Sequence, residues 1–240
     1  SGGKAAKTAA GKARAAAKRD PDLVREVLPG GLRLLVRRDR SVPVVAMRAV
    51  WTGGVRLETA DNNGISALLA GLITRGCGNR SGDELAAEVD RMAGGLAGVA
   101  GRNSFGLRAE WLADAWEKGL ELLADCILSP RFDEDEVARE RRRLQDELAA
   151  RDDSPSHLAF RLFAETLYRT HPYRLDPGGS AKSVATLTRK KLTAFYQAQF
   201  PASALTLAIV GDVDPARVVE LVRARFAEAS ASGPAPPTAP

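Results

Sequence analysis

The clearest pattern of apolar and polar positions lies in residues 62–76. Large apolar residues recur there at i, i+3, i+4, i+7 and i+8, namely Ile65, Leu68, Leu69, Leu72 and Ile73. This spacing is typical of one stripe of an amphipathic helix, and it predicts that the stripe faces the core. The opposite face, at positions 67, 70, 71 and 74, carries only Ala, Ala, Gly and Thr. These side chains offer no group to bind a metal or transfer a proton.

The remaining patterns predict an α+β fold, with a largely antiparallel sheet of about six strands packed with helices. Strands are expected at 23–28, 32–38, 44–51, 96–100, 104–111 and 204–210, and further helices at 82–93, 114–128, 132–152, 155–168, 187–200 and from 215 onward. The run at 44–51 is apolar at nearly every position except Arg48, which predicts a strand covered on both faces.

Charge is concentrated at the start of the chain. The net charge is +5, and residues 1–20 hold six Lys or Arg against one Asp, so they account for all of it (6 − 1 = 5). We expect a basic Ala-rich linker at 1–20, a single module at 21–228 and a Pro-rich linker at 229–240. The module has no basic excess and the first segment has no aromatic residue, which argues against nucleic-acid binding. No apolar run reaches the ~18 residues of a membrane span.

The residue types most often used in catalysis are sparse. Cys77 and Cys126 are predicted to be buried or half-buried free thiols, and His157 and His171 to be turn or surface residues without metal-ligand spacing. No Ser/His/Asp or Cys/His arrangement supports an unfamiliar active enzyme.

Sequence on both sides of the 62–76 helix is similar to that of a known family. A Trp-x-Gly-Gly-x-Arg-x-Glu-Thr run occupies 51–59, Asn63-Gly64 opens the helix, and Thr74-Arg75-Gly76 closes it. About residues 23–228 resemble the pitrilysin or insulinase metallopeptidases, which include insulin-degrading enzyme and mitochondrial processing peptidase. Active members carry an inverted zinc motif, H-x-x-E-H, on this helix. In register with Gly64, its three positions are Ala67, Ala70 and Gly71.

The resemblance also predicts where other site residues would lie. The last zinc ligand of the family is a Glu about 75 residues further on, a place that Glu147 fits. One ligand of three does not hold zinc, so no catalytic or metal site is predicted, and Glu147 is interpreted as a helix-surface carboxylate. Non-catalytic halves of the family lend an Arg and a Tyr to the bound peptide. Arg161 and Tyr168, seven apart on one predicted helix, are the candidates, with packing of Tyr168 at the core edge as the alternative.

The resemblance implies a non-catalytic lobe of a zinc metalloendopeptidase. Such a lobe closes the chamber and helps bind extended peptide for a zinc-bearing partner half, on the same chain or a separate subunit. A sheet edge near the cleft would pair with the peptide backbone. The alternative is a purely structural subunit of a core-protein-like complex without proteolysis. Register alone also suggests that Ala67→His, Ala70→Glu and Gly71→His, beside Glu147, would rebuild a zinc site.

Overall fold

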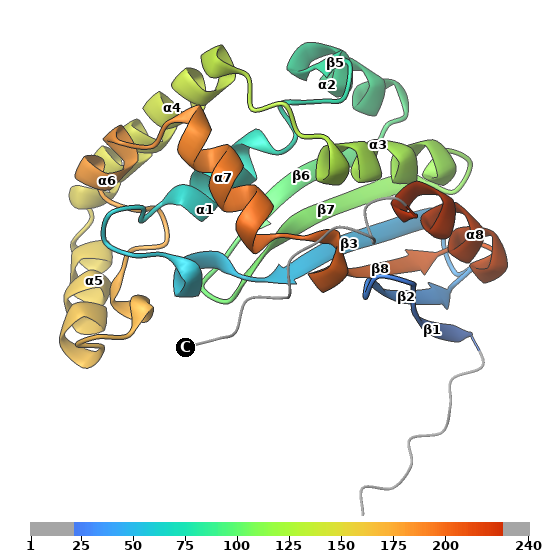
Figure 1. The fold of residues 1–240 in the computed structure, drawn as a ribbon, viewed down its shortest axis with the longest axis horizontal. Coiled ribbons are helices and arrows are strands. Elements are labelled where there is room, and N and C mark those ends of the chain that lie inside the picture. The colour runs from blue at the N-terminus through green and yellow to red at the C-terminus, as the bar shows by residue number, and fades with distance from the viewer. Residues whose placement is uncertain (1–21, 228–240) are drawn as a thin grey trace, which may run out of the picture.

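The computed structural model describes residues 22–227, in which one layer of helices covers one face of a six-stranded sheet (Figure 1). The linkers predicted at 1–20 and 229–240 lie outside the described residues. Within 22–227, none of the helices combines the length and apolar character needed to cross a membrane.

The sheet has the order β1-β2-β8-β3-β7-β6, so β8 lies between β2 and β3. All neighbouring pairs are antiparallel except β2 and β8, which confirms the prediction of a largely antiparallel sheet. A separate two-stranded ribbon, β4 with β5, follows the first helix. The strands are β1 (Leu23–Val27), β2 (Arg33–Arg38), β3 (Val44–Thr52), β4 (Gly76–Cys77), β5 (Arg80–Ser81), β6 (Gly95–Ala100), β7 (Ser104–Leu112) and β8 (Thr206–Gly211).

Several helices begin at residues whose side chains accept hydrogen bonds from free backbone N–H groups. Ser81 and Glu84 form the predicted capping box, and the Asp214 side chain accepts from the backbone N–H of Ala216 just after Pro215. The helices are α1 (Ile65–Leu72), α2 (Gly82–Arg91), α3 (Trp116–Leu128), α4 (Glu134–Asp152), α5 (Pro155–Leu167), α6 (Ala181–Ala185), α7 (Arg189–Gln199) and α8 (Pro215–Phe226), with 3₁₀ turns at Gly54–Leu57, Pro172–Arg174 and Ala202–Ala204.

Strand β3 differs from the sequence expectation. Its residues alternate, with Met47 and Ala49 buried and Arg48 and Val50 exposed. The prediction that β3 is covered on both faces is therefore wrong. The apolar run misled because Val44 and Val50 lie on the open face of the sheet, where a β-branched residue keeps its preference for strands without being buried.

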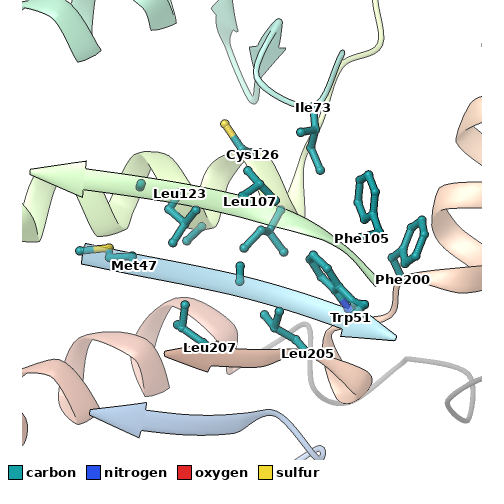
Figure 2. Close-up of a cluster of buried hydrophobic side chains, with 14 of the residues drawn as sticks. Met47, Trp51, Ile73, Phe105, Leu107, Leu123, Cys126, Phe200, Leu205 and Leu207 are labelled. Atoms are coloured by element: carbon teal, nitrogen blue, oxygen red, sulfur yellow. The ribbon is translucent and has the colours of Figure 1, made fainter. Parts of the chain in front are cut away.

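The core lies between the sheet and the helices (Figure 2). The rings of Phe105 and Phe200 stack with their centroids 4.2 Å apart, and Trp51 Nε1 donates to the carbonyl of Pro201 at 2.8 Å. The predicted stripe of α1 is buried in this core, and its Ile73 points toward the same cluster. Cys77 and Cys126 are buried free thiols, as predicted.

Candidate functional site

The N-terminus of α1 is held by the carboxylate of Glu58. This side chain is almost fully buried and accepts hydrogen bonds from the backbone N–H groups of Gly64 (2.8 Å) and Ser66 (3.0 Å). The first N–H groups of a helix lack partners within the helix, and the helix dipole favours an anion there. The Glu of the 51–59 run is thus the anionic cap that fixes where α1 begins. Gly64 adopts the left-handed φ of 92° that this start of the helix requires.

Asn63, next to this cap, ties α1 to a distant loop. Its Nδ2 donates to Oε2 of Glu58, the oxygen that also accepts from Gly64, and to the carbonyl of Asp176, both at 2.9 Å. Its own carbonyl accepts from the hydroxyl of Ser183 at 2.8 Å. The sequence Asn63-Gly64 therefore positions both the start of α1 and the segment 176–183, which includes the start of α6.

The face of α1 that carries no metal-ligating side chain lies between the edge strand β6 and helix α4. Ala67, Ala70 and Gly71 are half-buried there. A Cβ atom at Gly98 of β6 would lie 2.1 Å from the carbonyl oxygen of Ala70, so this strand needs glycine to approach the helix. On the other side, a Cβ atom at Gly71 would lie 1.8 Å from Oε1 of Glu140. The space that a larger residue would need at position 71 holds the Glu140 carboxylate instead.

Arg143 joins Glu140 to Glu147 along α4. The Glu140 side chain is only 6% exposed, whereas that of Arg143 is 51% exposed. The guanidinium donates from Nε to Oε2 of Glu140 at 2.9 Å and from Nη2 to Oε1 at 2.5 Å, and its Nη1 bonds Glu147. The hydrogen bond to Glu140 raises the pKa of the Arg143 guanidinium above its ordinary value. This triad, Glu140–Arg143–Glu147, places a permanent cation between two carboxylates beside α1.

The residues present do not fit zinc. A catalytic zinc site needs three protein ligands and an open position for water. Positions 67, 70 and 71 supply no ligand, Glu147 is bonded to Arg143, and within 22–227 no three His, Cys, Asp or Glu side chains are grouped as a metal site. A histidine at position 71 would also require the Glu140 carboxylate to move.

A pocket of about 800 Å³ lies beside the N-terminus of α1. It is bounded by residues 58–63, by α5 and by the segment 170–181, and Arg161 lines it. Tyr168 is not among its lining residues, because α5 ends at Leu167 and the helical spacing that would align the two side chains stops there. The Tyr168 ring packs instead edge-on against Tyr173, with centroids 5.5 Å apart. Substrate contacts by Arg161 and Tyr168 stay predictions.

Helix α5 carries exposed apolar side chains that the sequence reasoning did not single out. Phe160, Phe163 and Leu167, at i, i+3 and i+7, are 75%, 62% and 56% exposed and form a stripe on one side of the helix. Helix α5 lies at the end of the molecule opposite α8 (Figure 1). The spacing of this stripe was visible in the sequence, but a stripe that faces solvent has the same pattern as one that faces the core.

Two further residues of the site, Glu58 and Glu140, also escaped the sequence reasoning. Glu140 had a usable signal, because it lies on the same helical stripe as the buried Val137, Leu144 and Leu148. A charge at a core position is rare without a partner, and so marks a residue worth examining.

Comparison with known proteins agrees with the geometry of the site. Residues 33–176 match the family model described as insulinase (peptidase family M16), and residues 186–240 match the peptidase M16 inactive domain. Over 219 residues the chain is 31% identical to a protein named as an uncharacterized zinc protease of Mycobacterium leprae, covering 91% of this chain and 49% of that protein. Over 211 residues it is 26% identical to subunit 1 of the mouse mitochondrial cytochrome b-c1 complex, covering 88% of this chain and 44% of that subunit.

Solved structures share the fold. The peptidase M16 inactive domain from Pseudomonas fluorescens superposes with a TM-score of 0.84 at 22% identity, covering 91% of this chain and 53% of that one. A protease from Helicobacter pylori superposes with a TM-score of 0.82 at 25% identity, covering 92% of this chain and 53% of that one. The chain spans about half the length of the relatives it matches. With a family model matching more than half of its residues, the chain belongs to the insulinase family, peptidase family M16.

Proposed function

We propose that this domain is a non-catalytic lobe of an M16 zinc metalloendopeptidase, which closes the chamber and binds extended peptide for a zinc-bearing partner half. The observation that carries the proposal is the Glu140–Arg143–Glu147 triad packed against the ligand-free face of α1. The fold retains the helix that bears the zinc motif in active members. In this chain small residues occupy the motif positions, and the guanidinium of Arg143 is fixed beside the helix. Binding and orientation of the peptide are what this lobe contributes to catalysis.

The edge strand β6 is the place where a peptide would bind. It pairs with β7 on one side only, and no strand within 22–227 pairs with its other side. An extended peptide adds to such an edge through main-chain hydrogen bonds. Because Gly98 of β6 packs directly on Ala70, a peptide on this edge would pass the positions where an active half holds zinc.

Peptide binding by the 240-residue chain tests the proposal. A fluorescein-labelled, unstructured twelve-residue peptide is titrated and its anisotropy measured, with hydrolysis followed by mass spectrometry in the presence of zinc. We expect saturable binding and no cleavage. Peptides N-methylated at alternate residues serve as matched controls, because N-methylation removes backbone donors without changing side chains. Equal binding by the methylated peptides would contradict pairing at an edge, and cleavage by the chain alone would overturn the non-catalytic assignment.

The relation to the cytochrome b-c1 subunit favours a second candidate, a structural subunit without proteolysis. A scaffold of this kind has no need to bind extended peptide. The same titration therefore distinguishes the two functions, since no binding at micromolar concentrations supports the scaffold. Co-elution with an H-x-x-E-H-bearing M16 half from the same organism in gel filtration supports the lobe.

A further inference from the structure

A smaller pocket, of about 260 Å³, lies between α5 and residues 174–177. Four arginines line it: Arg102, Arg151, Arg161 and Arg174. Asp176 is its one acidic lining residue, so with His157 neutral the lining carries +3 (4 − 1). Residues 21–240 sum to zero (5 − 5), which makes this concentration of positive charge a local feature of the domain. We refer to this site as the arginine pocket.

The one carboxylate in the arginine pocket is engaged by other groups. Nε2 of His157 lies 2.8 Å from Asp176 Oδ2, and the backbone N–H of Gly178 donates to Oδ1 at 2.7 Å. Arg151 is 3.7 Å from the same Oδ1, longer than a direct hydrogen bond. Asp176 thus offsets only part of the positive charge that Arg102, Arg151 and Arg174 bring to the pocket.

Two of the arginines are oriented by neutral partners. Nη1 of Arg102 donates to the carbonyl of Tyr173 at 2.8 Å, and Nη1 of Arg174 donates to the carbonyl of Arg169 at 3.0 Å. A carbonyl fixes the direction of a guanidinium without neutralising its charge. Each guanidinium has five N–H donors, so these bonds leave donors for a ligand. Such preorganised guanidinium groups suit the planar, bidentate recognition of a carboxylate.

The arginine pocket also has an apolar side and a connection to β6. Phe160 and Leu175 line it, and Phe160 belongs to the exposed stripe of α5. Arg102 follows the end of β6 by two residues, so a peptide added along that edge would be led to the pocket.

We propose that the arginine pocket binds a carboxylate of the extended peptide, next to an apolar residue that packs on Phe160. The lobe would thereby select peptides in which an acidic group follows or precedes an apolar side chain. This inference rests on the proposed peptide-binding function and adds its substrate class. A carboxylate can come from a Glu or Asp side chain or from the C-terminus of the peptide, and the test separates these sources.

Four labelled peptides of one sequence test the proposal, with Leu-Glu or Leu-Gln at the centre and a free or amidated C-terminus. Charge-assisted hydrogen bonds from guanidinium groups should make the preferred acidic peptide bind about tenfold more tightly than its neutral match. Preference for Glu over Gln would show that the pocket binds a side-chain carboxylate. Preference for the free acid over the amide would show that it binds the C-terminal carboxylate. The preference should weaken as salt is raised from 50 to 300 mM, because added ions screen the charges.

Arg174→Gln and Arg102→Gln are expected to reduce the preference for the acid, while Lys190→Gln, an equal charge change on the exposed surface of α7, is expected to leave it intact. Equal binding of acidic and neutral peptides would contradict carboxylate binding in the arginine pocket and leave the proposed peptide-binding function standing. Loss of the acid preference in Lys190→Gln would also contradict it, because the net charge of the chain alone would then explain the preference. If none of the four peptides binds, the proposed function and this inference both fail.

Discussion

Replacement of Arg143 by alanine measures how far the triad stabilises the domain. The substitution leaves the carboxylate of Glu140, with its side chain only 6% exposed, without its cation. Breaking a fully buried ion pair costs roughly 3–5 kcal/mol, and a solvent-exposed pair contributes about 0–1 kcal/mol. Because half of the Arg143 side chain is exposed, water screens the pair, and we expect a loss of about 1–2 kcal/mol in the free energy of unfolding.

Urea denaturation followed by circular dichroism measures this loss, and in a domain of this size each kcal/mol also lowers the melting temperature by about 2–4 °C. Arg142→Ala, at an exposed position of the same helix, is the matched control and should change stability by less than about 0.5 kcal/mol. Glu140→Gln in the Arg143→Ala background should recover much of the loss, because a neutral amide needs no cation. The reasoning is refuted if Arg143→Ala is no worse than Arg142→Ala, or if Glu140→Gln gives no recovery.

Three further predictions concern the cap of α1, the capping box of α2 and the buried thiols. Glu58→Ala should lower the free energy of unfolding by about 1–3 kcal/mol in urea denaturation, because buried N–H groups at the start of α1 lose their acceptor. Glu58→Gln should lose less, and equal stability of both variants and the unsubstituted chain would contradict the role of Glu58 as a cap. Hydrogen bonds from Ser81 lower the pKa of Glu84 below its ordinary value of 4.5, so its contribution is present above pH 4.5 and lost as the pH falls through the lower folded value. Melting temperatures of Glu84→Gln should therefore fall less steeply between pH 5 and 3 than those of the unsubstituted chain. Cys77 and Cys126 should react with Ellman's reagent in urea and not in buffer, and rapid reaction of the folded chain would show that they are accessible.

The sequence was sufficient for the parts of the fold that depend on local pattern. The buried stripe of α1, the capping box at Ser81 and the cap at Asp214 each follow from residues within one or two turns. Which faces of the sheet are covered depends on the placement of distant helices. For that reason the run at 44–51 was assigned to a doubly covered strand although its Val50 side faces solvent.

The missing ligands of the candidate site could be predicted from the sequence, but the contacts between its residues could not. The register from Gly64 located Ala67, Ala70 and Gly71, which the structure places together on the half-buried face of α1. It did not indicate that Glu140 lies against Gly71, because that contact joins two helices about seventy residues apart. The arginine pocket depends likewise on the loop at 174–177, whose position no local pattern specifies.

The triad also decides what would be needed to restore a metal site. The substitutions Ala67→His, Ala70→Glu and Gly71→His supply the missing motif, but the imidazole introduced at position 71 meets Glu140, and the Glu147 carboxylate remains bonded to Arg143. A guanidinium is charged at every accessible pH, so it competes with a divalent cation for the same oxygens. We expect the triple variant to retain no stoichiometric zinc after gel filtration, measured by atomic emission. Adding Arg143→Val should leave both carboxylates without their cation, so that Glu140 can move away from position 71 and Glu147 can bind zinc. A further Glu147→Gln is the control that abolishes zinc binding. Stoichiometric zinc in the triple variant would show that Arg143 does not block the site.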